Sequence, residues 1–194
     1  MYAFITGKTV ALSPALAVLD NNGIGYEINI SVNTYSAIQG QDTCRLYTYL
    51  VVREDAQLLY GFATESEKEL FTHLISVSGI GPNTARMILS SFPPEEIVQA
   101  ILQEDEATIK SIKGVGPKSA KRLILELKDK LKKSEGDMLT APVADNTIRQ
   151  EALSALVMLG FNKNASEKAI AKVLKAHPDT ATVEALVKQS LKNL

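Results

Sequence analysis

A short motif of glycine and proline occurs twice in this chain of 194 residues, and the two copies lie in the same register. The first copy reads Gly-Ile-Gly-Pro from Gly79, and the second reads Gly-Val-Gly-Pro from Gly114, an offset of 35 residues. Apolar positions also match, since Leu74 aligns with Ile109. Such self-similarity is typical of a repeated supersecondary unit. The repeat predicts two helix-hairpin-helix motifs, in which a second helix begins near each proline.

The residue types of the motif favour binding of a phosphate group. Glycine lets an anion approach the backbone without meeting a Cβ atom. Proline fits the first turn of the next helix, whose free N–H groups and dipole attract anions. Such contacts hold the nucleic-acid backbone and carry little sequence information. The candidate DNA-binding residues are Gly79, Gly81, Asn83 and Thr84 in the first hairpin, and Gly114, Gly116, Lys118, Ser119, Lys121 and Arg122 in the second.

The charge distribution supports this interpretation. The whole chain has a formal net charge of −1, which does not by itself suggest a nucleic-acid partner. Residues 110–133, however, hold 9 basic and 2 acidic side chains around the second motif. A single Gly-x-Gly-Pro could simply end one helix and start another. Two copies in register, one of them in a basic stretch, favour backbone binding. The later lysines are interpreted as the solvated face and end of a long helix: Lys128, Lys130, Lys132 and Lys133.

Alternating apolar residues and turn signals predict strands in residues 1–63. The expected strands cover residues 2–12, 15–20, about 26–30, 44–52 and 57–62, with a short helix near residues 33–39. Strands of this number and order in so short a segment indicate a small antiparallel barrel of the oligonucleotide/oligosaccharide-binding (OB) type. Cys44 is expected to pack on a strand face.

The remainder of the chain reads as helical. Thr64 and Glu67 have the spacing of a capping box, and helices are expected from there to Lys133. Residues 134–146 contain Gly136 and Pro142 and show no periodicity, which predicts a flexible acidic linker. The expected fold class is therefore a multidomain α+β protein. Its parts are an OB-fold barrel over residues 1–63, an all-α tandem helix-hairpin-helix domain over 64–133, the linker over 134–146, and a three-helix module similar to ubiquitin-associated domains over 147–194.

The residues offer no catalytic or metal-binding pattern. Residues 7–9 resemble the end of a phosphate-binding P-loop but lack its first glycine, so ATP hydrolysis is not expected. His73, His177 and Cys44 cannot build a zinc site of the usual ligand number. We therefore expect no catalytic residue, no metal and no cofactor. The single cysteine, the absence of a secretion signal and the lack of a long apolar run predict a cytoplasmic protein without a membrane span.

The chain as a whole resembles the RuvA family of Holliday junction-binding subunits. The most specific segment is residues 51–62, which read VVREDAQLLYGF and are followed by the two hairpins in the expected order. The resemblance implies that Glu54 and Asp55 form an acidic pin, which repels phosphates at the junction centre and disfavours ordinary duplex there. It also makes Arg53 a candidate DNA contact. From the residue types alone, the two acids are solvated turn residues and the arginine is a surface residue.

The resemblance also implies an assembly and its partners. Four subunits would form a flat homotetramer over a square-planar four-way DNA junction, with an octamer as a further possibility. A separate RuvB-type hexameric ATPase would be the motor, and a junction resolvase would be another partner. The C-terminal module would dock on the motor, while its apolar residues Leu156, Leu159 and Phe161 could equally form its own core. The chain would then be a non-catalytic subunit of an ATP-dependent helicase complex in recombination and repair.

Two positions depart from the family pattern. Asn83 stands where members often carry lysine in the first hairpin, and Pro117 stands where some carry another lysine. The first hairpin is therefore expected to rely on backbone N–H groups. The lower charge also predicts that DNA affinity depends less steeply on salt than in a more basic relative.

Two other functions compete with junction binding. One is a generic scaffold for single-stranded nucleic acid, in which barrel tyrosines stack on bases. The candidate stacking residues, most of which could instead fill the core, are Tyr26, Tyr35, Tyr47, Tyr49 and Tyr60. The other is a nuclease fragment with tandem hairpins, which needs a cluster of metal-binding carboxylates that the sequence does not offer.

Overall fold

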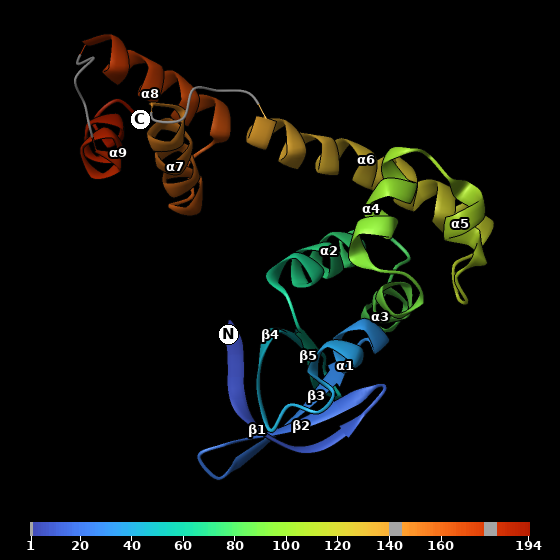
Figure 1. Cartoon of the computed structure of the whole chain (residues 1–194). Helices are drawn as coiled ribbons and strands as arrows, with labels where there is room; N and C mark the ends of the chain where they lie inside the picture. The colour runs from blue at the N-terminus through green and yellow to red at the C-terminus, as the bar shows by residue number, and fades with distance from the viewer. Residues whose placement is uncertain (1, 140–144, 177–181) are drawn as a thin grey trace. The chain divides into compact units, whose positions relative to one another are not determined.

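The computed structural model describes residues 2–139, 145–176 and 182–194 (Figure 1). It divides into two compact units, Met1–Glu135 and Gly136–Leu194.

The first unit begins with a closed barrel of strands in the order β1-β2-β3-β5-β4. The strands are β1 (Phe4–Ser13), β2 (Leu16–Asn21), β3 (Ile24–Ile30), β4 (Thr43–Val52) and β5 (Gln57–Phe62), and helix α1 (Val32–Ile38) precedes β4. β3 pairs with β5 in parallel, whereas the other neighbouring strands pair antiparallel. The expected OB-type barrel is thereby confirmed, but it is not wholly antiparallel, because β3 and β5 pair in parallel.

Alternate strand residues point inward and form the barrel core. The buried members are Ile5, Ala17, Leu19, Ile28, Ile30, Ile38, Cys44 and Leu46. Cys44 thus packs on a strand face, as expected. Small residues are required where strands approach closely, because a Cβ atom on Gly61 would lie 2.5 Å from the Ile28 side chain.

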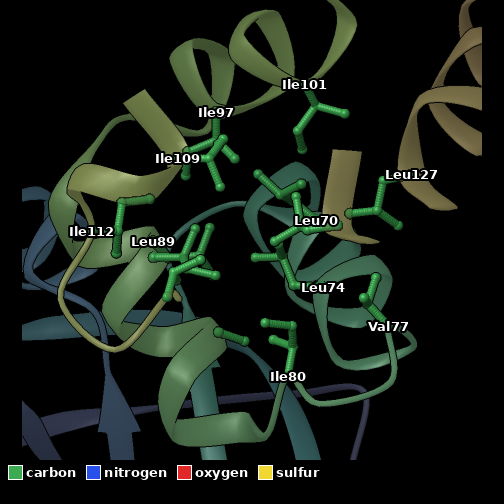
Figure 2. Close-up of a cluster of buried hydrophobic side chains, with 14 of the residues drawn as sticks. Leu70, Leu74, Val77, Ile80, Leu89, Ile97, Ile101, Ile109, Ile112 and Leu127 are labelled. Carbon is green, nitrogen blue, oxygen red and sulfur yellow. The ribbon is translucent and has the colours of Figure 1, made fainter. Parts of the chain in front are cut away.

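Five helices follow the barrel in the first unit. They are α2 (Glu65–Ile75), α3 (Pro82–Ser91), α4 (Pro94–Leu102), α5 (Glu106–Ser111) and α6 (Pro117–Leu139). Their apolar faces meet in one buried cluster, which Figure 2 shows with side chains from both repeats converging. Repeat-related positions are buried in both copies, as with Leu74 and Ile109. The internal repeat is therefore a repeat of structure.

Aromatic packing joins the helices to the barrel. The ring centroid of Phe71 in α2 lies 5.5 Å from Tyr49, 5.2 Å from Tyr60 and 4.8 Å from Phe62. Because these strand residues share a buried cluster with the helical core, the barrel and helices form one unit.

The expected linker differs from the structure at its ends. Helix α6 continues past Lys133 to Leu139, and α7 begins at Asp145. A single interior glycine such as Gly136 costs a helix only about 1 kcal/mol, so its presence does not end the helix. Residues 140–144, including Pro142, lie outside the described residues, and the domain boundaries stay predictions.

The second unit contains α7 (Asp145–Met158), α8 (Lys163–Ala176) and α9 (Val183–Leu191), which match the three helices expected there. Their shared core consists of Ala152, Leu156, Ile170, Val173 and Leu186. Leu156 is therefore a core residue. His177 and Pro178 lie outside the described residues.

Candidate nucleic-acid interface

The two hairpins have the same backbone geometry. We define hairpin 1 as residues 76–87 and hairpin 2 as residues 111–122, so that each includes the first turns of the helix that follows. Gly79 has a φ of +92° and Gly114 has a φ of +89°, in the left-handed region that favours glycine. A Cβ atom at either position would meet no atom within 4 Å. Glycine is therefore required for backbone conformation, and the space in front of each hairpin is open.

Matching hydrogen bonds close the hairpins. The N–H of Ile80 donates to the Val77 carbonyl at 3.0 Å, and the N–H of Val115 donates to the Ile112 carbonyl at 3.1 Å. All four side chains are buried. The apolar residues thus anchor each hairpin in the core, while its glycines remain at the surface.

Each hairpin leads into a helix with free N–H groups at its start. In α3 the cap residue is Gly81, which offers no side-chain oxygen, and Pro82 occupies the first turn. Within residues 2–139, the N–H groups of Asn83 and Thr84 have no hydrogen-bond partner, and the same holds for Lys118 and Ser119 in α6. These N–H groups can donate to a phosphate oxygen, and the positive end of the helix dipole favours its negative charge.

The predicted DNA-binding cations of hairpin 2 fall into two groups. Lys118 and Lys121 are exposed and form no ion pair with another described residue. Arg122 instead donates from Nη1 to the Ser78 carbonyl of hairpin 1 at 3.4 Å, and its Nε lies 3.5 Å from Glu126. The predicted DNA contact Arg122 therefore also links the two hairpins.

Hairpin 1 is attached to the barrel by contacts that the sequence did not predict. The Tyr60 hydroxyl donates to Asn83 Oδ1 at 3.0 Å. Arg86 Nη1 donates to the Ala15 carbonyl at 3.0 Å and to Asn29 Oδ1 at 3.1 Å. The only sequence signal for Arg86 is its repeat register, which matches Lys121.

Glu67 has a different role from the one its spacing predicted. Thr64 caps α2 by accepting from the Glu67 N–H at 3.2 Å, which confirms half of the capping box. The Glu67 carboxylate, however, accepts from the hydroxyls of Ser31 at 2.5 Å and Thr34 at 2.7 Å. This buried carboxylate therefore ties the barrel helix α1 to α2.

The two acids of the VVRED segment lie at the tip of the β4–β5 hairpin. The turn is closed by the Arg53 N–H, which donates to the Ala56 carbonyl at 2.8 Å. Glu54, Asp55 and Arg53 are all exposed. We call Glu54 and Asp55 the acidic turn. It belongs to the same compact unit as both hairpins.

The barrel tyrosines do not form an open stacking surface. Tyr60 is 1% exposed, and Tyr26, Tyr35, Tyr47 and Tyr49 are half-buried. Three of them pack against core clusters. Base stacking needs an accessible ring face, so this arrangement disfavours the single-strand scaffold.

In the second unit, the three apolar residues near the end of α7 differ in burial. Leu156 is buried, whereas Leu159 is 61% exposed and Phe161 is 38% exposed. They flank Gly160, whose φ of +97° lets the chain turn after α7.

Within the described ranges, no helix is both long and apolar enough to cross a membrane. Among the same residues, no group of three or more His, Cys, Asp or Glu side chains is arranged to hold a metal ion.

The fold and the two hairpins define a class: proteins that combine an OB-type barrel with a tandem helix-hairpin-helix domain. Comparison with known families agrees along the chain. Residues 1–61 match the RuvA N terminal domain, residues 71–129 match the SAM-like Helix-hairpin-helix tandem, and residues 147–194 match the RuvA, C-terminal domain.

Full-length relatives give the same result. The chain is 50% identical over 204 residues to a protein of Bacteroides fragilis and 48% identical over 204 residues to one of Bacteroides thetaiotaomicron. It is 49% identical over 194 residues to one of Flavobacterium psychrophilum. Each alignment covers 100% of both chains, and each relative is named Holliday junction branch migration complex subunit RuvA. The chain belongs to the RuvA family.

Proposed function

We propose that this chain binds four-way DNA junctions as the non-catalytic subunit of a branch migration complex. The observation that carries the proposal is that two hairpins with free N–H donors and an exposed acidic turn lie in one compact unit. The names of its full-length relatives support the same function.

The hairpins and the acidic turn act on DNA in opposite ways. Free N–H groups at the starts of α3 and α6 attract phosphates, and Lys118 and Lys121 add positive charge beside hairpin 2. Glu54 and Asp55 repel phosphates. DNA arms would therefore be held by the hairpins, while uninterrupted duplex would be disfavoured wherever it must pass the acidic turn. A four-way junction, whose strands part at its centre, meets both conditions.

The remaining partners follow from this role. A homotetramer, or an octamer of two such assemblies, would surround a junction with four arms. A separate RuvB-type hexameric ATPase would supply the motor, with a junction resolvase as a later partner, all in the cytoplasm. Exposed apolar residues of the second unit, Met158, Leu159 and Phe161 among them, are the candidates for contact with the motor. Arg53, exposed beside the acidic turn, would contact DNA.

The test is a binding titration of the full chain with a four-way junction, a linear duplex and a single strand of equal length, at two salt concentrations. We expect the junction to be bound most tightly, in stepwise oligomeric complexes, and to stay bound in excess duplex. Preference for the single strand would support the scaffold function instead. Equal affinity for all three DNAs would refute structure-specific recognition.

A further inference from the structure

The two hairpins use matching repeat positions differently. Asn83 and Arg86 of α3 align, at the 35-residue offset, with Lys118 and Lys121 of α6. In α3 both side chains contact the barrel. In α6 both lysines are exposed and make no ion pair with any residue that the structure describes. The same two places in the repeat thus hold barrel contacts in one copy and exposed cations in the other. In the second copy, a hydrogen bond from Lys110 and, to a lesser extent, the charge of Lys121 lower the pKa of Glu106.

The Tyr60–Asn83 hydrogen bond has a defined direction. Tyr60 is almost fully buried in β5, and its hydroxyl donates to Asn83 Oδ1. Burial raises the pKa of Tyr60, against the opposing effect of Arg86 and Arg53, so the hydroxyl remains a donor at neutral pH. With Oδ1 held, Nδ2 is left as the donor of this amide at the start of α3, without a partner within residues 2–139.

Arg86 reinforces this attachment one turn further along α3. Its guanidinium bonds to the Ala15 carbonyl and to Asn29 Oδ1. Asn29 Nδ2 in turn donates to the Leu59 carbonyl at 3.2 Å. Leu59 and Tyr60 are neighbours in β5, the strand that leaves the acidic turn. Hairpin 1 and the acidic turn are therefore connected through a single strand.

The other end of α3 is also attached to the barrel. Asn33 Nδ2 in α1 donates to the carbonyls of Leu89 at 2.6 Å and Phe92 at 2.8 Å. The N–H of Val32 donates to Ser90 Oγ at 3.1 Å. Because α3 is held at both ends, its N-terminus has a set direction relative to the barrel, and Figure 1 shows α1 and α3 side by side.

We propose that Tyr60 and Asn83 are positioning residues for junction recognition, which orient hairpin 1 relative to the acidic turn. Lys118 and Lys121, at the equivalent positions of the second repeat, supply charge to the phosphate contacts of hairpin 2. Hairpin 1 thus contributes mainly to the choice of DNA structure, and hairpin 2 mainly to affinity. This inference rests on the proposed function.

The test compares Tyr60→Phe, Asn83→Ala and the double variant in the full chain, with dissociation constants measured for the junction and for linear duplex. Tyr60→Phe keeps the buried ring and removes one hydrogen bond, so we expect the preference for junction over duplex to fall by about threefold to tenfold. In Tyr60→Phe the slope of affinity against salt should not change, because the substituted side chain is buried and contacts no phosphate. The double variant should lose no more preference than the larger single effect, since both changes break the same bond.

Two matched controls isolate the effect. Tyr2→Phe removes a barrel hydroxyl that has no hydrogen-bond partner within residues 2–139, and it should bind like the unsubstituted chain. Lys118→Asn places the hairpin 1 residue in hairpin 2. It should weaken binding to both DNAs equally and reduce the salt slope by about one. A general loss of folded protein would also affect both DNAs equally, so the preference ratio separates positioning from stability.

An unchanged ratio in both single variants, or fully additive effects in the double variant, would overturn the positioning role. If Tyr60→Phe proves unstable in thermal unfolding, Asn83→Ala, at an exposed residue, decides the question. Failure of the proposed function would look different, since the unsubstituted chain itself would then show no junction preference.

Discussion

At the scale of single residues, one buried carboxylate joins two parts of the first unit. Glu67 is 3% exposed, and its two oxygens accept from the Ser31 and Thr34 hydroxyls. Each hydroxyl also accepts a backbone N–H, from Thr34 and Ala63 respectively, so each has its proton directed at Glu67. Burial raises the pKa of Glu67, and the two hydroxyl hydrogen bonds oppose that effect.

The raised pKa of Glu67 predicts a pH dependence of stability. The folded chain holds this proton more tightly than the unfolded chain does, so the free energy of unfolding falls as pH rises from the ordinary glutamate pKa through the folded value. Glu67→Gln cannot titrate and should lack this contribution, which amounts to about 1.4 kcal/mol for each tenfold difference in proton affinity between the folded and unfolded chains. Denaturant unfolding of both proteins across the acidic range measures it. A stability difference that stays constant with pH would contradict the expectation.

Substitutions at the two glycines of hairpin 2 can distinguish an effect on backbone conformation from an effect on phosphate access. Gly116→Ala introduces a methyl group at a position without positive φ and with open space around it, so folding should persist while phosphate approach is hindered. Gly114→Ala imposes a left-handed conformation on alanine and should destabilise the fold by about 1–2 kcal/mol. Thermal unfolding and duplex binding distinguish the two effects. Undiminished DNA affinity in folded Gly116→Ala would count against the phosphate-binding role of hairpin 2.

At the scale of elements, the β4–β5 hairpin and the two helix-hairpin-helix motifs have opposite proposed roles on DNA. The β4–β5 ladder extends from Tyr47–Phe62 to Val52–Gln57 and carries the exposed acidic turn at its end. The helical motifs carry donors and cations. Negative charge therefore lies on the β4–β5 hairpin, and positive charge lies beside the start of α6. Both elements pack on buried cores.

The acidic turn predicts a specific loss of discrimination. Glu54→Gln combined with Asp55→Asn removes two charges from exposed side chains, so stability should change by less than about 0.5 kcal/mol. Duplex should bind more tightly, and the preference for a four-way junction should fall, because phosphate repulsion is lost. Competition binding with junction and duplex measures this. If discrimination is unchanged in the folded double variant, Glu54 and Asp55 do not form a pin.

At the scale of the whole molecule, the chain consists of two units with separate cores. Both hairpins and the acidic turn lie in the first unit. The exposed apolar residues Leu159 and Phe161 lie in the second unit. The proposed DNA binding and the proposed motor contact therefore involve different units of the same chain.

This separation predicts the behaviour of a fragment. Residues 1–139 contain the complete first core, so the fragment should unfold cooperatively and bind a four-way junction within about threefold of the full chain. It should fail to stimulate a RuvB-type motor. Circular dichroism melting, junction binding and ATPase stimulation test these points. A fragment that folds but binds DNA weakly would show that the second unit contributes to DNA binding.

The sequence by itself determined the barrel, the repeated hairpins and the three C-terminal helices. Strand alternation, the Gly-x-Gly-Pro repeat and local turn signals depend on short-range geometry, which a single sequence carries. Candidate residues such as Gly79 and Gly114 could be named for the same reason, because their left-handed conformation is a local property.

Only the tertiary structure decided which polar side chains form hydrogen bonds between distant elements of the fold. Glu67 was predicted to bond to its own helix start, yet its carboxylate bonds to residues 33 and 36 positions earlier. Asn83 and Arg86 bond to barrel residues, whereas Lys118 and Lys121 in the same repeat register do not. Local patterns cannot separate these cases, because long-range hydrogen bonds depend on where distant elements pack. The physical reason is that the core brings α3, but not the start of α6, against the barrel.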